Sequence, residues 1–252
     1  MHKIPVSVVV ITKNEEENIR TCLESVHGWV DETVIVDDES TDRTVELARE
    51  FTDKIFHRKM ENEGIHRNWA HQQTRNEWIL SLDADESVTE ELKQSIIQTI
   101  PNTEVDAFNI KSRNFLGDYW IRYGGWYFGK LKMFKKSLFR YEEVEVHPRV
   151  FFQGKAGDLE GDLIHKLANN FEQFLGSLNR QTTLEARKWI LTNRKMTFGK
   201  AMWRAVDRFP RRYFRKKGRK DGFIGFMMAF FDSLYQIMSY AKFWEMKRTQ
   251  GK

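Results

Sequence analysis

The sequence is poor in the residues that make a chain disulfide-linked or disordered. It has one cysteine and four prolines among 252 residues, and 13% of its residues are aromatic. One cysteine excludes a disulfide within the chain, which favours a reducing compartment. Cys22 follows Ile19 at helical spacing, so we expect a buried thiol. This composition indicates a folded protein with a sizeable core.

Long hydrophobic runs are also missing. The apolar run at residues 6–11 is far too short to cross a membrane, and the N-terminus shows no signal-peptide pattern. We therefore interpret this run as a buried strand and expect a cytoplasmic protein.

Positive charge is concentrated in one segment. The formal net charge is +5, but residues 199–222 alone contain ten Lys or Arg against two Asp. Such a basic block suggests an anionic partner, which could be membrane lipid, nucleic acid or a phosphorylated substrate.

The first hundred residues alternate between strand and helix patterns. Short apolar runs predict strands at residues 6–11, 33–36, 54–57 and 78–82. Helical spacing of apolar residues predicts helices at residues 15–26, 41–50, 65–75 and 88–100. This alternation predicts an α/β fold with a mostly parallel sheet, whose ligands bind at the carboxyl ends of the strands.

The pattern changes after Pro101. Shorter strands are predicted at residues 106–115, 131–134, 138–141 and 150–152, and the chain is helical from residue 170 onward. We therefore divide the chain into an α/β domain at residues 1–168 and a helical, basic region at residues 169–252.

Two acidic residues directly follow the fourth predicted strand. Asp83 and Asp85 are one residue apart, so in extended backbone they point the same way, toward one pocket at the end of the strand. Carboxylate oxygens suit Mg²⁺ or Mn²⁺, which usually also bind substrate phosphates. The alternative is a solvated acidic turn that caps the next helix.

Polar residues also follow the first two predicted strands. The first strand leads into Thr12, Asn14 and Glu15, and the second leads into Asp37 and Asp38. Short polar side chains at strand ends can hydrogen-bond a base or a ribose. The two adjacent acids repel each other unless a ligand or a cation compensates them. Helix capping explains the Ser and Thr that follow them.

Three motifs in order resemble those of the family 2 glycosyltransferases with the GT-A fold. They are T-x-N-E at residues 12–15, V-D-D-x-S-T-D at residues 36–42 and L-D-A-D-E at residues 82–86. Each motif alone is weak, but the three at these spacings are specific. The resemblance implies a Rossmann-like GT-A fold and a nucleotide-sugar donor, often a uridine diphosphate (UDP) sugar.

The resemblance also implies roles for single residues. The donor-binding residues would be Thr12, Asn14, Glu15, Asp37, Asp38, Arg67 and Asp83. Of these, Asp37 or Asp38 would bind the base, and Arg67 would lie near the diphosphate. The Mn²⁺ or Mg²⁺ ligands would be Asp85, Asp83 and His165. A surface charge for Arg67 and a structural role for His165 are the alternatives.

Residues 123–135 are similar to the G-G-W-Y…R-L-F stretch of lipopolysaccharide core glycosyltransferases in this family. By this resemblance, Trp126 and Tyr127 would form an apolar platform for the acceptor sugar. Lys132 stands where Arg is common, which keeps the charge but loses the bidentate fork. Core aromatics around a glycine turn are the alternative.

Inversion at the anomeric carbon needs a general base for the acceptor hydroxyl. Glu143, Glu145 and His147 alternate, so they share one face if their segment is a strand. We predict Glu145 as the base and Glu143 as the second candidate. Many relatives carry Glu directly after the matching histidine, where this chain has Pro148. An exposed acidic edge strand is the alternative.

Basic and aromatic residues are interleaved in the C-terminal third. Residues 222–244 are largely apolar, but Asp232, Gln236 and Ser239 follow at i, i+4 and i+7 and make the predicted helix one-sided. A membrane span would place Asp232 near mid-membrane, which is costly. We expect a helix that lies on an anionic membrane surface or packs on the catalytic domain. A packed subdomain with a solvated basic face is the alternative.

These features predict an inverting, metal-dependent glycosyltransferase at the cytoplasmic membrane face. UDP-glucose as donor and the lipopolysaccharide inner core as acceptor rest on the resemblance alone. A sugar-nucleotide-forming nucleotidyltransferase would need a Gly-rich phosphate loop, but residues 13–17 contain three acids and no glycine. A nucleic-acid-binding protein would explain the basic block but not Asp83 and Asp85. A processive synthase would need Q-x-x-R-W, and residues 181–189 lack that spacing.

Overall fold

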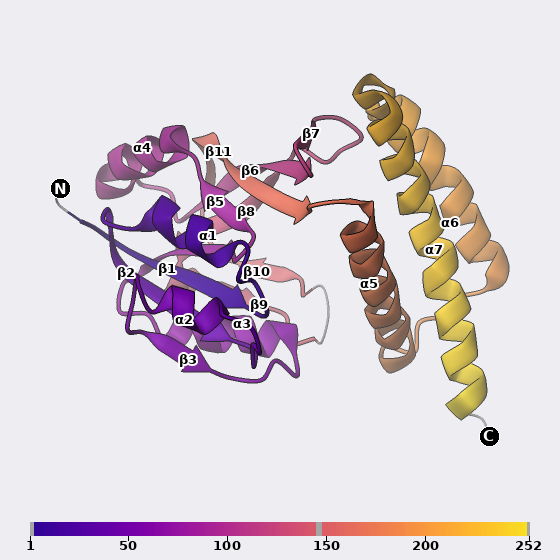
Figure 1. Cartoon of the computed structure of the whole chain (residues 1–252), viewed down its shortest axis with the longest axis horizontal. Coiled ribbons are helices and arrows are strands. Elements are labelled where there is room, and N and C mark those ends of the chain that lie inside the picture. The colour runs from indigo at the N-terminus through magenta and orange to yellow at the C-terminus, as the bar shows by residue number, and fades with distance from the viewer. Residues whose placement is uncertain (1–2, 145–147, 251–252) are drawn as a thin grey trace. The chain divides into compact units, whose positions relative to one another are not determined.

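The computed structural model describes residues 3–144 and 148–250 (Figure 1). The chain forms two compact units, of which the first comprises Met1–Ser112 and Phe128–His165, and the second comprises Arg113–Tyr127 and Lys166–Lys252. The second unit thus includes residues 113–127, which precede the predicted boundary at residue 168. The functional division proposed at that boundary stays a prediction.

A mixed β-sheet forms the centre of the first unit. Its strands lie in the order β3-β2-β1-β4-β8-β6-β11-β5. The four strands from β3 to β4 pair in parallel, and the pairs β4–β8, β6–β8 and β5–β11 are antiparallel. The strand bounds are β1 (Ile4–Thr12), β2 (Val30–Asp37), β3 (Ile55–His57), β4 (Trp78–Asp83), β5 (Glu86–Val88), β6 (Ala107–Leu116), β8 (Gly129–Lys135) and β11 (Ala156–Ala168).

Helices cover both faces of this sheet. Their bounds are α1 (Ile19–Val26), α2 (Thr44–Ala48), α3 (Glu63–Gln72) and α4 (Glu90–Thr99). A separate antiparallel pair consists of β9 (Phe139–Tyr141) and β10 (Val150–Phe152). The 3₁₀ turns η1 (Ile100–Asn102) and η2 (Lys136–Leu138) follow α4 and β8.

The burial of β1 explains its unbroken apolar sequence. Val8, Val9 and Val10 pair with β2 on one edge and with β4 on the other, and each is at most 1% exposed. Val8 and Val10 pack in the core cluster that contains α1 and α4, whereas Val9 packs in the cluster that contains Ala70 of α3. A strand that is covered on both faces requires such a run of β-branched residues.

The predicted alternation of strands and helices in the first hundred residues is confirmed, although three helices begin later than predicted, among them α4, which begins at Glu90 rather than at residue 88. α1 begins at Ile19 rather than at residue 15, and α2 begins at Thr44 rather than at residue 41. The preceding residues instead form loops that are hydrogen-bonded to each other, as where the amide of Glu16 donates to Asp42 Oδ2 at 3.2 Å. Strand β11 is not predicted from the sequence, because glycines and charged residues interrupt its apolar pattern.

The second unit is mainly helical. It contains β7 (Tyr119–Ile121), α5 (Phe171–Leu191), α6 (Phe198–Pro210), η3 (Arg211–Arg215), η4 (Gly218–Asp221) and α7 (Gly222–Gln250). α7 packs on both α5 and α6, with one apolar cluster around Leu178 and Met228 and another around Trp189 and Phe243. Within residues 3–144 and 148–250, no helix combines the length and the apolar character that crossing a lipid bilayer requires.

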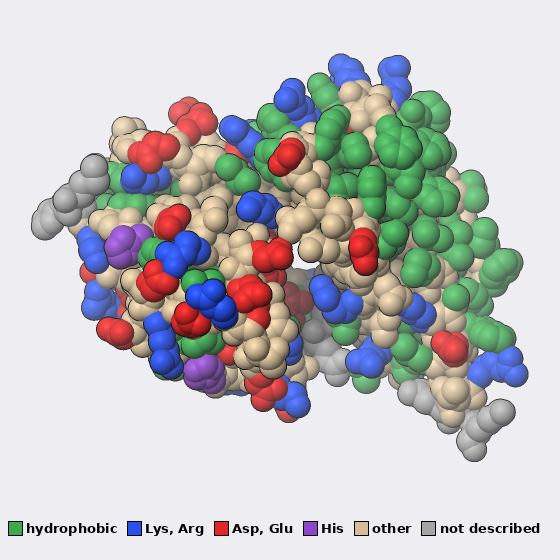
Figure 2. Space-filling view, in the orientation of Figure 1, with side chains coloured by type: hydrophobic (Ala, Val, Ile, Leu, Met, Phe, Trp, Pro, Cys, Tyr) green, Lys and Arg blue, Asp and Glu red, His purple; other side chains and the backbone are tan. Residues whose placement is uncertain are grey.

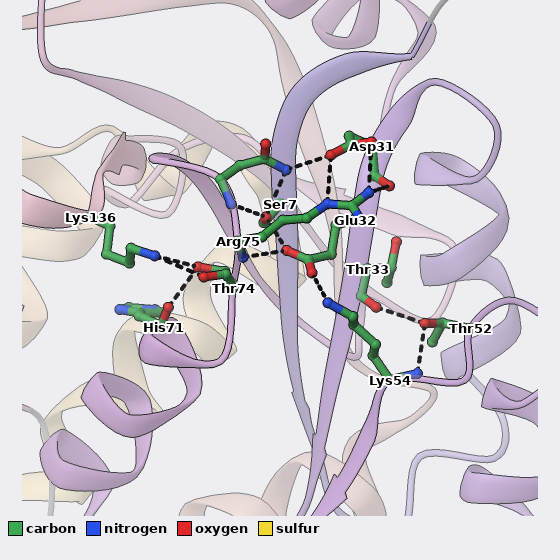
Figure 3. A network of polar contacts seen from close by, with 11 residues as sticks. Ser7, Asp31, Glu32, Thr33, Thr52, Lys54, His71, Thr74, Arg75 and Lys136 are labelled. Carbon is green, nitrogen blue, oxygen red and sulfur yellow. Dashed lines mark hydrogen bonds and ion pairs between the residues drawn. The ribbon is translucent and has the colours of Figure 1, made fainter.

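A buried carboxylate on β2 holds neighbouring segments of the first unit together (Figure 3). Glu32 is 5% exposed, and its oxygens accept hydrogen bonds from Ser7 Oγ, Lys54 Nζ and the amide of Arg75. Burial opposes ionisation, but Lys54, Ser7 and the Arg75 amide outweigh it and lower the pKa of Glu32. The network therefore stabilises the fold only while Glu32 is ionised.

We expect Glu32→Gln to lower the free energy of unfolding by about 1–3 kcal/mol at neutral pH, because the amide removes a charge and places a donor against Ser7 or Lys54. Since the folded-state pKa is lowered, the wild-type advantage is present above the unfolded pKa of about 4.3 and is lost as pH falls through the folded value. Urea unfolding at a series of pH values measures both effects. The exposed Glu24→Gln serves as control, and a wild-type advantage that does not shrink in acid would contradict this role.

Candidate active site

The ends of three strands meet at one edge of the sheet in the first unit. Thr12 of β1 lies beside Asp37 of β2, and Ile11 of β1 lies beside Asp83 of β4. The three strands are parallel, so their carboxyl ends meet at the same edge, as predicted. The structure thus brings the three predicted motifs together.

The first two loops are hydrogen-bonded to each other. Asn14 has a positive φ of 53°, and its amide donates to Ser40 Oγ at 2.8 Å. Its side-chain oxygen accepts from the amide of Thr41, also at 2.8 Å. Glu15 Oε2 accepts from Asn18 Nδ2 at 2.8 Å. Asn14 and Glu15, which were predicted as donor-binding residues, therefore also fix the shape of the loops.

Asp37 and Asp38 are both buried, but their surroundings differ. Asp38 accepts from the amide of Met60 at 2.7 Å and pairs with Lys13 Nζ at 3.0 Å, so both of its oxygens are engaged. Asp37 Oδ2 accepts from the amide of Ser40 at 3.1 Å and lies 3.2 Å from His57 Nδ1. Among the described residues, Asp37 Oδ1 has no hydrogen-bond partner. Asp37 is therefore the better placed of the two acids to accept a bond from a nucleotide base.

Four charged side chains form a cluster where β4 ends. Asp83 Oδ1 lies 2.9 Å from Arg67 Nη2, and Asp83 Oδ2 lies 3.0 Å from Lys132 Nζ. The Lys132 ammonium also lies 2.6 Å from Glu86 Oε2, which in turn accepts from the amide of Asp83 at 3.0 Å. The side chains of Lys132 and Glu86 are 8% and 1% exposed. The cluster links α3, β4, β5 and β8.

The charges in this cluster stabilise one another. Burial opposes ionisation of Asp83, but Lys132 and Arg67 outweigh it and hold the pKa of that carboxyl well below its usual range. Burial likewise opposes protonation of Lys132, but Asp83 and Glu86 raise its pKa. Both oxygens of Asp83 thus face cations of the protein. The structure places Lys132 against Asp83 and Glu86, and its predicted contact with the acceptor stays a prediction.

Asp85 has a different environment from Asp83. Its Oδ2 lies 3.2 Å from His165 Nε2, and its Oδ1 is buried without a hydrogen-bond partner among the described residues. Burial alone would lower the pKa of His165, but the hydrogen bond and charge of Asp85 raise it. The structure therefore brings two of the three predicted metal ligands into contact.

A divalent cation fits the spare oxygen of Asp85. In the part of the chain that the structure describes, no three His, Cys, Asp or Glu side chains converge as a metal-binding group. Mg²⁺ in phosphate-binding sites, however, is usually held by one or two carboxylates and completed by substrate phosphates and water. Asp85, with His165 beside it, is compatible with an ion of this kind, and Asp83 is already engaged by Lys132 and Arg67.

The segment that was predicted to carry the general base packs on α3. Glu145 lies outside the described residues. Glu143 is exposed, and residues 142–144 do not form a strand, so the condition under which Glu143, Glu145 and His147 would share one face is not met there. Asn68 of α3 bonds to both the amide and the carbonyl of Tyr141, at 2.8 and 2.9 Å. The amide of Gly64 donates to the carbonyl of Val144 at 3.2 Å. The start of α3 therefore positions this segment.

Trp126 and Tyr127 belong to the second unit. Gly124 and Gly125 before them have φ values of 68° and 80°, which form the predicted tight turn. The Trp126 ring packs in an apolar cluster with Arg212 at 6.0 Å, and Tyr127 is 37% exposed with its ring 5.8 Å from that of Trp120. Tyr127 is thus the more accessible part of the predicted acceptor platform.

Glu86 and Tyr141 also lie in this site, although neither was predicted as a site residue. Glu86 is the last residue of the L-D-A-D-E motif, and a carboxylate that is 1% exposed needs a buried cation, which Lys132 supplies. The Tyr141 ring lies 5.6 Å from the Arg67 guanidinium. Nothing in the local pattern of residues 138–141 indicates that contact, because the partner is some seventy residues away.

The fold and the acids at the strand ends are those of a glycosyltransferase. The chain belongs to glycosyl transferase family 2, whose sequence model matches residues 7–154. The predicted family, the predicted GT-A fold and the predicted enzyme class are thereby confirmed, with the fold supported by the structural neighbours below.

The chain is similar over most of its length to glycosyltransferases of two bacteria. It is 25% identical to the lipopolysaccharide core biosynthesis glycosyltransferase LpsC of Rhizobium meliloti, with 96% of this chain and 93% of LpsC covered. It is also 25% identical to an uncharacterized glycosyltransferase of Rickettsia typhi, with 96% and 87% covered. Among solved structures, TarS of S. aureus in complex with UDP has a TM-score of 0.51 and 16% identity, with 99% and 92% covered, and this likeness concerns the fold.

We expect Gly64→Ala to disturb the segment that α3 positions. A Cβ atom at residue 64 would lie 1.8 Å from the backbone oxygen of Glu142, so the backbone would have to move. Overpacking of this kind costs about 1–3 kcal/mol, and it should lower sugar transfer more than donor hydrolysis by water if this segment carries the base. Gly176→Ala on α5 has open space and should leave stability unchanged or raise it. Full transfer activity in Gly64→Ala would contradict this positioning role.

We expect Lys132→Met to destabilise the first unit. It would leave Glu86 buried without a cation, which costs about 3–5 kcal/mol for a broken buried ion pair. The exposed Lys130 of the same strand offers a matched control, and Lys130→Met should leave stability almost unchanged. Chemical denaturation of the two variants measures the difference, and equal stability would show that the cluster is unimportant for the fold.

Proposed function

We propose that the protein is an inverting, metal-dependent glycosyltransferase that moves a hexose from a UDP-sugar to a membrane-held glycolipid. The observation that carries this proposal is the contrast between the two acids of the L-D-A-D-E motif. Asp83 is engaged by two cations, whereas Asp85 keeps a buried oxygen without a partner among the described residues. One acid thus shapes the site, and the other is left for a ligand.

The chain's own residues account for donor binding. Asp37 Oδ1 would accept a hydrogen bond from the base, which selects a base with a donor at that position. Arg67, held between Glu63 and Asp83, would place positive charge beside the diphosphate. A divalent ion at Asp85, with His165 beside it, would supply Lewis-acid neutralisation of the leaving diphosphate. One structure of TarS contains UDP-GlcNAc, which makes a uridine donor the first to test.

Glu145, or Glu143 in second place, would take the proton of the acceptor hydroxyl as it attacks the anomeric carbon. Attack from the face opposite the leaving diphosphate inverts that carbon. Trp126, Tyr127 and Lys132 remain the proposed acceptor-binding residues. The similarity to LpsC over most of both chains supports a lipopolysaccharide core acceptor, with glucose onto the inner core as the specific proposal. Such an acceptor implies action at the cytoplasmic face of the membrane.

The rival functions have less support. A nucleotidyltransferase would place a triphosphate on the loop after β1, where Glu15, Glu16 and Glu17 follow Asn14 and no glycine is present. A nucleic-acid-binding protein leaves the spare oxygens of Asp37 and Asp85 without a role. The family 2 domain at residues 7–154 contains both acids.

Donor hydrolysis tests the proposed function most directly. Purified protein is incubated with UDP-, GDP- and CMP-sugars, with and without Mn²⁺, and released nucleotide is measured. We expect slow, metal-dependent release from one UDP-sugar. Asp85→Ala should lower this rate by about 100-fold or more with an unchanged circular dichroism spectrum, because His165 is the one residue that the structure shows bonded to its carboxylate among the described residues.

Asp53→Ala provides the control, since Asp53 is an exposed acid away from the strand ends that form the site. No release from any donor, together with no metal-dependent thermal stabilisation by any nucleotide, would refute the proposal. Loss of the circular dichroism signal in Asp85→Ala would instead assign that acid to the fold.

A further inference from the structure

The helix α7 has its polar stripe inside, together with buried apolar residues such as Met228 and Phe243, and it has a second apolar stripe outside. Gln236 and Ser239 are 3% and 0% exposed, and Asp232 is paired with Arg208 at 3.1 Å and with Arg212. The polar stripe seen in the sequence therefore faces the interior of the second unit. A helix on the surface of a water-soluble domain normally has charged and polar residues on its outer face.

The outward stripe of α7 consists of large hydrophobic residues. Phe223, Phe230, Ile237 and Trp244 follow one another every seven residues, which keeps them close to one face of a helix. All four are exposed, from 38% at Ile237 to 67% at Phe223. At 29 residues, α7 is about 43 Å long, so the stripe extends over several turns.

α6 extends this surface. Trp203 and Val206 of α6 are 70% and 61% exposed. α6 packs along α7. The Phe209 ring makes an edge-to-face contact with Phe226 near the start of α7, and the Phe198 ring lies 6.0 Å from that of Tyr240 further along α7. Figure 2 shows hydrophobic side chains gathered over the helices of this unit. We call Trp203, Val206, Phe223, Phe230, Ile237 and Trp244 the α6–α7 apolar surface. Exposed apolar areas of this kind mark interaction sites.

Cations lie at both ends of α7. Just before it, Arg215, Lys216, Lys217, Arg219 and Lys220 are all exposed. In its last turn, Lys247 and Arg248 are exposed, and the Arg248 guanidinium lies 4.7 Å from the Trp244 ring. An apolar stripe with basic groups at its ends matches the boundary between acyl chains and anionic headgroups.

The same charges argue against a second copy of the chain as the occupant. If two α7 helices paired lengthwise, either direction would bring basic ends together. Glu245 is the one acidic residue of α7 other than Asp232, and Asp232 is already paired with arginines. A bilayer that contains anionic lipids has the complementary charge.

We propose that the α6–α7 apolar surface docks in the plane of an anionic lipid bilayer, with its aromatic side chains at headgroup depth. This inference rests on the proposed function, which places the acceptor in a membrane. It adds to that function the surface by which the protein contacts the membrane. The polar stripe of α7 faces the interior of the second unit and keeps α7 packed on α5 and α6. The helix therefore lies on the bilayer and does not cross it.

The test is cosedimentation of the full chain with vesicles. One set contains phosphatidylcholine alone, and the other contains equal parts of phosphatidylcholine and phosphatidylglycerol. The wild type should sediment with the second set and much less with the first. Phe230→Ser combined with Trp244→Ser should lower the partition coefficient by about tenfold or more. Phe151→Ser combined with Leu175→Ser removes two exposed hydrophobic residues elsewhere and should leave it unchanged.

Neutralising Lys217, Arg219 and Lys220 to Gln should weaken binding to the anionic vesicles alone. Equal sedimentation of the Phe230→Ser/Trp244→Ser protein and the wild type would overturn the proposal. So would a wild-type dimer in lipid-free sedimentation velocity that these two substitutions dissociate, because the surface would then belong to a second copy.

Donor hydrolysis without vesicles separates this inference from the proposed function. The Phe230→Ser/Trp244→Ser protein should release nucleotide at the wild-type rate, because neither residue is part of the candidate active site. Vesicle binding by a wild type that releases no nucleotide would refute the proposed function and leave the docking surface standing. Nucleotide release by a wild type that does not bind anionic vesicles would refute the docking surface and leave the proposed function standing.

Discussion

The balance of charge where β4 ends is the constraint on which the candidate active site depends. Glu86 and Lys132 are nearly inaccessible to water, and a single buried charge in either place would cost several kcal/mol. The cations that balance Asp83 of β4 and Glu86 of β5 come from α3 and β8, so four elements must pack correctly before the end of β4 is stable. Asp85 lies between Asp83 and Glu86 in the sequence, and its carboxylate keeps one oxygen without a hydrogen-bond partner among the described residues.

The parts of the fold set by local pattern could be predicted from the sequence. The run Val8–Val10 indicates a strand that is buried on both faces, and the motifs after three strands lie at one edge because parallel strands end together. The place of Lys132 could not be predicted in this way. Its ammonium reaches Asp83 because β8 pairs antiparallel with β4, a partnership between segments some fifty residues apart. Strand β11, which carries His165, could not be predicted for a similar reason. It is held in place by pairing with β5, and its own sequence lacks the apolar alternation that indicates a strand.

α7 shows a second limit of sequence patterns. Helical periodicity establishes that Asp232, Gln236 and Ser239 share a face, but it does not say whether that face meets water or protein. The answer depends on Arg208 and Arg212, which approach Asp232 from α6 and η3. Once these partners are known, the inward direction of the stripe follows, because the two arginines compensate the charge of Asp232, which is 15% exposed, with charge-assisted hydrogen bonds. The outward direction of the aromatic residues is then a consequence of helix geometry.

The placement of residues 113–127 in the second unit connects docking with acceptor binding. The turn that leads to Trp126 is fixed to this unit, because Arg212 Nη1 donates to the carbonyl of Gly124 at 2.7 Å and Asp221 accepts from the amide of Tyr123 at 2.8 Å. Both partners belong to the basic segment that precedes α7. A second unit that docks on lipid therefore carries the proposed acceptor platform with it, whatever its position relative to the first unit. An acceptor held in the same bilayer would then meet Trp126 and Tyr127 at a raised effective concentration, with no additional contact needed.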